Sequence, residues 1–262
     1  MYGDVPFMGE RNFRELGGLP AQNGKRIKRG LLWRGASTAC LVSYGDRALL
    51  DELGLKTILD LRSTIEEASA HDIVPDGCTY IRICGLCGPE GEEISFSPKD
   101  IEWIRSQEKT VNFEASGPVG MYAAMLGGLK AYKKLFELLE NGETPLLFHC
   151  AAGKDRTGIA AMLILLALGA DDETITANYN ETNRCRKPII DAEMERRAKA
   201  IAADPSEAKM VQQYFGVDSN MMQTMLRVIR ERWGSTENYL LTVYGLDETR
   251  LQHLREMYLE EE

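Results

Sequence analysis

A short apolar segment, a run of ten small and polar residues and a second apolar segment follow one another beyond the middle of the 262-residue chain. Residues 145–148 have the length of a buried strand, and residues 159–168 are almost wholly apolar and stop at Gly169, as a buried helix does. A buried strand that leads into a buried helix is typical of an α/β sheet. The connecting residues 149–158 then lie at the carboxyl end of a strand, where open α/β sheets bind their ligands.

The other apolar patterns along the chain predict more elements of the same two kinds. The expected strands cover residues 31–34, 57–61 and 79–84, and the expected helices cover residues 44–53, 122–139, 172–180, 189–201, 220–233 and 248–258. Strands that alternate with helices indicate an α/β fold with a mostly parallel central sheet, flanked by helices and extended by helical additions at the C-terminus. We expect a single domain over residues 1–262.

Residues 85–120 interrupt this regular pattern. They contain Pro89, Pro98, Pro118 and five glycines, and only one turn of helical spacing. An irregular segment of this length inside a compact domain usually has a function. We therefore predict a lid or substrate-facing insertion over residues 85–120, with a passive surface loop as the alternative.

The charge balance excludes some classes of function. Forty acidic against 31 basic residues give a net charge of −9, which disfavours a general binder of nucleic acids or anionic membranes. No apolar stretch approaches the ~20 residues that span a bilayer, and the N-terminus lacks the pattern of a secretory signal peptide. Six cysteines in a chain of this length do not make a disulfide scaffold. We expect a cytoplasmic protein without a transmembrane segment, and leave open export by a route without such a signal.

The connecting segment is rich in groups that bind a phosphate. Ala151, Ala152 and Gly153 are small enough for the backbone to curl until successive N–H groups point at one centre. The helix that begins near Thr157 adds the positive end of its dipole. Arg156 offers a planar fork that matches two phosphate oxygens. The segment therefore predicts a phosphate-sized cup.

Cys150 lies at the bottom of this cup, where the same positive field activates its thiol. A free cysteine, with a pKa of about 8.5, is only a few per cent thiolate at neutral pH. The helix terminus, the amides and Arg156 together are sufficient to lower that pKa until the thiol is ionised. Thr157 can hydrogen-bond the sulfur when it departs, and His149 is expected to orient the loop. A purely structural cysteine is the alternative, but it does not explain the charged residues 154–156.

The segment His-Cys-x-x-Gly-Lys-Asp-Arg-Thr-Gly at residues 149–158 resembles the phosphate-binding loop of cysteine-dependent phosphatases. Its version of the loop is that of the bacterial atypical, dual-specificity protein tyrosine phosphatases. The resemblance extends over nearly the whole chain except residues 85–120, through blocks at 11–18, 30–34, 59–63, 233–235 and 239–240. It implies a cysteine-phosphatase fold, a phosphatase activity, and neither a cofactor nor a metal.

The roles of the loop residues follow from phosphate chemistry. Cys150 attacks phosphorus and forms a cysteinyl-phosphate, while Arg156 and the loop amides stabilise the equatorial oxygens. Many tyrosine phosphatases take a general acid from a Trp-Pro-Asp loop, but no tryptophan here precedes Pro-Asp. We predict, as the resemblance also implies, that Asp155 is the general acid. The alternative acids, from the expected lid, are Glu92, Glu93 and Asp100. The expected phosphate-binding residues are Ala151, Ala152, Gly153, Lys154, Thr157 and Gly158, with His149 in support.

The expected substrate is phosphotyrosine. Lys154 adds a cation at the rim, and its contact with a second phosphate would extend the range to phosphoserine, phosphothreonine and phosphoinositides; a solvated loop charge is the alternative. A phosphoinositide or inositol-phosphate phosphatase is the alternative main activity, and a rhodanese-like sulfurtransferase or an inactive phosphate-binding module is less favoured. The expected partners are a phosphorylated protein or phospholipid and inorganic phosphate, and no nucleic acid.

Two other patterns are expected to be structural. Asp60 and Arg62 follow an expected central strand, and we interpret them as a buried pair that braces the loop. Cys84 and Cys87 form a single CxxC without a second pair, which is weak evidence for zinc or redox chemistry.

Overall fold

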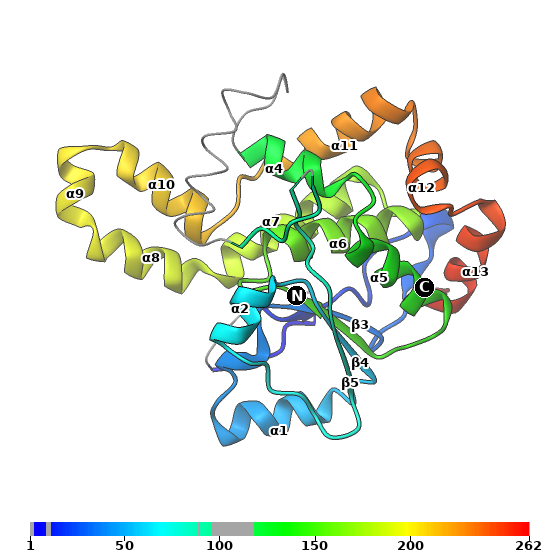
Figure 1. The fold of residues 1–262 in the computed structure, drawn as a ribbon, viewed down its shortest axis with the longest axis horizontal. Helices are drawn as coiled ribbons and strands as arrows, with labels where there is room; N and C mark the ends of the chain where they lie inside the picture. The colour runs from blue at the N-terminus through cyan, green and yellow to red at the C-terminus, as the bar shows by residue number, and fades with distance from the viewer. Residues whose placement is uncertain (1–2, 9–11, 89, 96–117, 262) are drawn as a thin grey trace.

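The computed structural model describes residues 3–8, 12–88, 90–95 and 118–261 (Figure 1). Its strands are β1 (Arg14–Glu15), β2 (Arg26–Ile27), β3 (Leu32–Gly35), β4 (Thr57–Asp60), β5 (Thr79–Arg82), β6 (Leu146–His149) and β7 (Leu259–Glu260). Its α-helices are α1 (Tyr44–Glu52), α2 (Thr64–Ser69), α4 (Pro118–Met125), α5 (Lys130–Glu140), α6 (Asp155–Ala167), α7 (Asp172–Cys185), α8 (Lys187–Arg196), α9 (Ala198–Ala203), α10 (Ser206–Phe215), α11 (Met221–Trp233), α12 (Thr236–Tyr244) and α13 (Glu248–Tyr258). Short 3₁₀ turns cover Gln22–Gly24 and Thr38–Cys40.

The central sheet has five strands in the order β1-β3-β6-β4-β5. β6 pairs in parallel with β3 and β4, and β4 pairs in parallel with β5, so that only β1, at one edge, runs antiparallel to its neighbour. β2 and β7 pair separately, so that residues 26–27 lie beside residues 259–260 near the C-terminus. The predicted α/β fold with a mostly parallel sheet and a helical C-terminal part is confirmed.

The sheet separates two apolar clusters. Adjacent residues of β4 and β6 alternate between them: Ile58 and Leu147 pack in the smaller cluster with Leu50 of α1, and Leu59 and Phe148 pack in the larger one. The larger cluster takes in all of α6 from Ile159 onward and the apolar faces of α5, α11 and α13. α1 lies on one side of the sheet and α5 and α6 on the other (Figure 1). A parallel strand with helices on both faces is buried on both faces, which explains its continuous apolar run.

The predicted helix over residues 122–139 is wrong in one respect. The apolar spacing is real, but the segment forms two helices, α4 and α5, joined by residues 126–129. Gly128 in this junction has a φ of +76°, a conformation that ends a helix and that residues with a Cβ rarely adopt. The predicted helix over 189–201 likewise forms two, α8 and α9, which meet at Arg197.

The helices α8, α9 and α10 project from the body of the molecule and return to it at the end of α10 (Figure 1). The sequence patterns did not predict α10 or α12. Much of the predicted lid, residues 96–117, lies outside the described residues; of the rest, Leu86 and Ile94 pack in the larger cluster. Within the described residues, no helix has the length and apolar character needed to cross a membrane.

Candidate active site

The segment singled out in the sequence connects the central strand β6 to the buried helix α6. His149, the last residue of β6, is in register with Gly35 at the end of β3 and with Asp60 at the end of β4. The carboxyl ends of three neighbouring parallel strands therefore meet at the loop, as expected for a ligand site in an α/β sheet.

The carbonyl groups of the loop are held from outside. The Ala151 carbonyl accepts from the amide of Ser37 (3.2 Å), and Asn12 Nδ2 donates to the carbonyls of Ala152 (2.8 Å) and Gly153 (3.0 Å). In a trans peptide the N–H points opposite to the C=O. The amides that follow these three carbonyls therefore point away from the supporting groups, which is the arrangement of the predicted anion-binding nest.

Gly153 is required by space as well as by backbone conformation. Its φ is +66°, and a Cβ at this position would lie 2.5 Å from the carbonyl carbon and oxygen of Gly35. Only a glycine allows the loop to lie this close to the end of β3.

Cys150 lies at the floor of the site and is almost fully buried. Burial alone raises the pKa of its thiol, but Arg156 and the hydroxyl and amide of Thr157 outweigh that effect and hold the pKa below its usual value. The positive end of α6, which begins at Asp155, acts in the same direction. These groups favour the thiolate, the nucleophilic form of cysteine.

Arg156 is buried and is oriented by a residue of another helix. Its Nη1 and Nη2 donate to the two carboxylate oxygens of Glu66 in α2, at 2.6 and 2.7 Å, and Nη1 also lies 3.3 Å from the Leu61 carbonyl. Burial disfavours the charged guanidinium, but Glu66 and the Cys150 thiolate more than compensate and raise the pKa of Arg156. Arg156 is therefore a fixed cation beside the sulfur.

Asp155 is connected to two buried tyrosines. Tyr122 of α4 donates its hydroxyl to Asp155 Oδ1 at 2.5 Å, and the hydroxyls of Tyr122 and Tyr179 lie 2.6 Å apart. Burial and the neighbouring carboxylate raise the pKa of Tyr122 well above its usual value, so this hydroxyl keeps its proton. The other oxygen of Asp155 lies 3.3 Å from Lys154 Nζ.

Lys154 also ties the loop to the end of α10. Its ammonium donates to the carbonyls of Gln213 and Gly216, both at 3.1 Å. Arg186 makes a similar link: its Nε donates to the Phe215 carbonyl at 2.8 Å, and its Nη1 lies 3.4 Å from the Ala152 carbonyl. The projecting helices are therefore fastened to the rim of the loop.

A pocket of about 420 Å³ opens above the sulfur. Its floor is formed by the loop, and its walls come from α4, α7, α10 and the connection to α11. The wall residues are mainly aromatic and apolar, and include Met121, Tyr122, Tyr179, Tyr214, Phe215, Val217 and Met221. The pocket has the shape and lining for an aromatic group whose phosphate lies on the loop.

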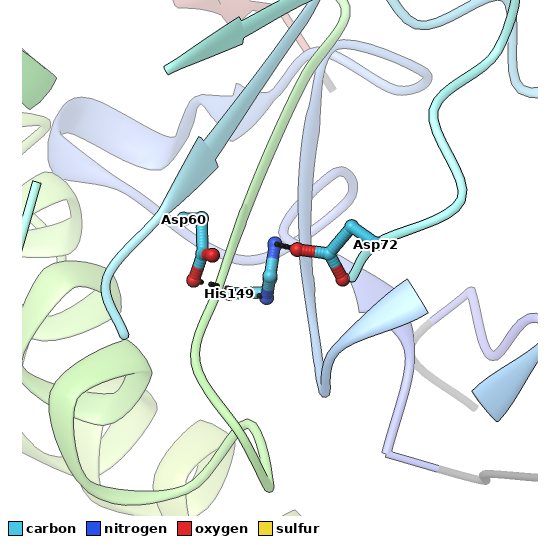
Figure 2. A group of neighbouring side chains, drawn as sticks. All are labelled: Asp60, Asp72 and His149. Atoms are coloured by element: carbon cyan, nitrogen blue, oxygen red, sulfur yellow. Dashed lines mark ion pairs between the residues drawn. The ribbon is translucent and has the colours of Figure 1, made fainter. Parts of the chain in front are cut away.

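Behind the loop, His149 lies between two aspartates (Figure 2). Its Nε2 is 3.3 Å from Asp72 Oδ2, and its Nδ1 is 3.8 Å from Asp60 Oδ1. Burial opposes a charge on the imidazole, but the aspartates outweigh it and raise the pKa of His149. Arg62 bridges the same two carboxylates, at 2.9 Å to Asp60 and 2.5 Å to Asp72.

This group resembles a metal-ligand set in composition, but its oxygens already have partners. Besides Arg62, Tyr80 donates to Asp60 at 2.7 Å, and Ser37 donates to Asp72 at 2.7 Å. A guanidinium between the carboxylates holds the place that a divalent cation would need. The group fits a buried ion-pair network that supports the loop, as predicted for Asp60 and Arg62.

The structure brings most of the predicted site residues to one place. Of the expected catalytic and phosphate-binding residues, those that line the pocket are Cys150, Ala151, Ala152, Lys154, Asp155 and Arg156. Thr157 and Gly158 lie in the first turn of α6, where Gly158 packs against the Tyr179 ring. The sequence reasoning missed the roles of Glu66, Asn12 and Tyr122. For Glu66 a signal existed, since Ser63-x-x-Glu66 is a capping box.

Comparison with known proteins agrees with this geometry. The model of the tyrosine phosphatase family matches residues 5–260. A protein named as a tyrosine-protein phosphatase in Cupriavidus necator is 30% identical over 251 residues, which cover 95% of this chain and 87% of the relative. The triple specificity protein phosphatase PtpB of Mycobacterium tuberculosis is 26% identical over 96% of this chain and 97% of its own. A tyrosine-protein phosphatase of Nostoc commune is 28% identical over 80% of this chain and 68% of its own. The chain belongs to the tyrosine phosphatase family and is a phosphoric monoester hydrolase.

Proposed function

We propose that this protein hydrolyses phosphotyrosine through a cysteinyl-phosphate intermediate on Cys150. The observation that carries the proposal is the buried Cys150 thiol, whose pKa Arg156 and Thr157 hold below its usual value at the floor of an aromatic-walled pocket. A thiolate under an anion-binding nest is the nucleophile that phosphoryl transfer to sulfur requires.

The reaction has two steps. In the first, the Cys150 sulfur forms a bond to phosphorus, the bond from phosphorus to the tyrosine oxygen breaks, and Asp155 gives its proton to that oxygen. In the second, water attacks phosphorus, its proton passes to Asp155, and the sulfur departs as a thiolate that Thr157 stabilises. The products are tyrosine and inorganic phosphate, and no redox step or cofactor is involved.

Asp155 is the acid best supported by its surroundings. It lines the pocket with Cys150, and Tyr122 fixes one of its oxygens. Glu92 and Glu93 are not among the residues that line this pocket. Burial raises the pKa of Glu93, but hydrogen bonds from Arg82 and Thr64 outweigh this effect and hold the pKa below its usual range, which disfavours a proton donor. The third alternative, Asp100, lies outside the described residues.

The lining of the pocket favours an aromatic leaving group over a polyphosphorylated headgroup. Lys154, the residue expected to meet a second phosphate, already binds two carbonyls and Asp155. Activity on phosphoserine, phosphothreonine and phosphoinositides is a second proposal. It is supported by Arg186, a second cation that lines the pocket, and by the triple specificity named for the mycobacterial relative.

The other readings have less support. The Lys-Asp-Arg-Thr run does not suit a rhodanese-like sulfurtransferase, and an inactive phosphate-binding module has no need of the hydrogen bond between Tyr122 and Asp155. The single domain and the cytoplasmic location remain predictions, as do the phosphorylated protein or phospholipid partner and the absence of nucleic-acid binding.

Hydrolysis of p-nitrophenyl phosphate and of a phosphotyrosine peptide tests the proposal. We expect turnover that vanadate inhibits and that Cys150→Ser abolishes while the fold is kept. Rapid quenching during turnover should trap phosphate on the protein through sulfur. Folded wild-type protein that hydrolyses neither compound would contradict the proposal. A phosphoinositide panel assayed beside the peptide then ranks the two substrate classes.

A further inference from the structure

Two arginines lie fully buried beneath the phosphate-binding loop. Arg14 of β1 and Arg34 of β3 are in register on neighbouring strands, and each has a relative exposure of 0%. Arg34 Nη2 donates to the Gly153 carbonyl at 3.0 Å. Arg14 reaches the loop only indirectly, because its Nη1 binds Asn12, whose amide holds the loop carbonyls.

The acceptors of both guanidiniums are neutral. Arg34 Nη1 donates to Asn178 Oδ1 at 2.6 Å, and Arg14 Nη2 donates to the Asn178 carbonyl at 2.8 Å. Among the described residues, neither arginine forms an ion pair with a carboxylate. Burial lowers the pKa of Arg14, and Cys185, Glu181 and Asp4 oppose this in that order. Burial raises the pKa of the Cys185 thiol, which favours its neutral form, and Glu181 and Asp4 are bound by the exposed Arg184, at 2.5 and 2.7 Å.

The other buried arginines of the site are different. Arg62 and Arg156 face Asp60, Asp72 and Glu66 directly. Burying a charge without a partner is strongly unfavourable even after the surroundings relax, so native proteins seldom do it. Burial lowers the pKa of Arg34, Arg14 lowers it further, and the Cys150 thiolate is the first group that acts in the opposite direction. For Arg34, the largest compensation of the buried charge therefore comes from the active-site thiolate.

We propose that Arg34, reinforced by Arg14, is a positioning residue whose buried charge is the counter-charge of the Cys150 thiolate and of the bound phosphoryl group. Its hydrogen bond to the Gly153 carbonyl also turns the Lys154 amide toward the anion. The inference rests on the proposed function, since it assumes that the loop binds a phosphoryl group. It assigns a task to two residues that touch neither the substrate nor the sulfur.

The variant Arg34→Met tests the charge, because methionine fills similar space without it. We expect the inhibition constant of vanadate, measured against p-nitrophenyl phosphate hydrolysis, to rise by about tenfold or more. The pH midpoint for alkylation of Cys150 by iodoacetamide should rise. The unfolding temperature in phosphate-free buffer should stay the same or increase, since a buried charge without a carboxylate partner is removed. Arg34→Lys, which keeps the charge but loses the fork, should keep its alkylation midpoint closer to that of the wild type.

Two further variants make the test decisive. Arg255→Met removes a mostly buried arginine that binds the Ala167 carbonyl, at the far end of α6, and should leave vanadate affinity and alkylation unchanged. Arg14→Met removes a charge that does not touch the loop, and should shift both readouts in the same direction as Arg34→Met. It decides the question if Arg34→Met fails to fold.

Values for Arg34→Met and Arg14→Met that equal those of Arg255→Met would overturn the inference. The inference is also overturned if Arg34→Met and Arg34→Lys lose vanadate affinity equally and Arg14→Met has no effect. The role of Arg34 would then be that of a hydrogen-bond donor to the loop, independent of its charge. Failure of the proposed function looks different: the wild-type protein itself would neither hydrolyse the ester nor bind vanadate.

Discussion

Glu66 and Arg156 lie 90 residues apart in the chain and form a two-point ion pair, with N–O distances of 2.6 and 2.7 Å. The same carboxylate closes the capping box of α2, where Glu66 Oε2 accepts from the amide of Ser63 at 3.0 Å. One side chain therefore caps the N-terminus of α2 and also orients the arginine of the phosphate-binding loop. The end of β4, α2 and the loop are joined at this point.

The variant Glu66→Gln should reduce kcat/KM for p-nitrophenyl phosphate by about 10- to 100-fold, because an amide cannot bind both ends of the guanidinium. Burial raises the pKa of Glu66, but its hydrogen bonds with Arg156 outweigh this and lower it, so the carboxylate persists into acid solution. Most of the loss should appear in kcat, since the arginine stabilises charge that develops in the transition state. Steady-state kinetics at several pH values measure the effect.

Glu67→Gln is the matched control. Glu67 is the next residue of α2, and its carboxylate pairs with the exposed His71 at 2.7 Å, away from the loop. We expect no more than a twofold change in either kinetic constant. A comparable loss in both variants would mean that α2, and not the ion pair with Arg156, is the origin of the effect.

Thr157→Val should raise the pH midpoint for alkylation of Cys150, because valine keeps the shape of threonine but lacks the hydroxyl that favours the thiolate. The pKa of Cys150 is lowered in the wild type, so its rate of alkylation should reach a plateau at a pH below the pKa of a free thiol, which is about 8.5. Thr176→Val removes another buried threonine hydroxyl, from α7, and should leave the midpoint unchanged. An unchanged midpoint in Thr157→Val would exclude the hydroxyl as a source of thiol activation.

The sequence alone predicted the elements whose signals are local. β6, α6 and the loop between them form one continuous pattern, and Ser43 caps α1 as its position suggests, accepting from the Asp46 amide at 3.0 Å. The candidate catalytic cluster could also be predicted, because the residues from Cys150 to Thr157 are adjacent in sequence, and the structure places most of them around one pocket.

The missing parts of the site depend on contacts between distant segments. No local pattern shows that Tyr122 contacts both Asp155 and Tyr179, or that the end of α10 forms a wall of the pocket. The break between α4 and α5 was missed because the apolar spacing continues across it; the pair Gly127-Gly128 was the local signal for a turn. No local pattern marks Arg14 and Arg34 as buried, since burial without a carboxylate partner is a property of the folded chain.

The network behind the loop should make stability depend on pH. His149 has a raised pKa in the folded protein, so its contribution is complete below its unfolded pKa of about 6.5 and is lost as the pH rises through the folded value. Cys150, with a lowered pKa, acts in the opposite direction, so measurements belong in a Cys150→Ser background. There, the free energy of unfolding in urea should fall as the pH rises above about 6.5, and His149→Gln should flatten this fall.

His71→Gln provides the control for that measurement. His71 is an exposed histidine with one carboxylate partner, so removal of its charge should change the pH dependence little. If His149→Gln leaves the fall in stability above pH ~6.5 as steep as His71→Gln does, His149 is not charged in the folded protein, and the ion pairs with Asp72 and Asp60 have no energetic role.

The general acid is tested by the leaving group. A proton donor matters most for an oxygen that leaves as a poor anion. Asp155→Asn should therefore lower kcat/KM for phenyl phosphate by about 100-fold or more, and that for 2,4-dinitrophenyl phosphate by less than about tenfold. Equal losses on the two esters, or no loss on either, would remove Asp155 from this role.

Tyr122→Phe extends the same test to the hydroxyl that holds Asp155 in place. Loss of the 2.5 Å hydrogen bond frees the Asp155 carboxyl to rotate. The loss of kcat/KM should therefore again be larger for phenyl phosphate than for 2,4-dinitrophenyl phosphate, with a difference about a tenth as large as in Asp155→Asn. Tyr258→Phe, which removes a buried hydroxyl bonded to the Leu139 carbonyl, should show no such preference. If Asp155→Asn discriminates between the esters and Tyr122→Phe does not, Asp155 is the acid but takes its orientation from the loop alone, and Tyr122 is only a wall of the pocket.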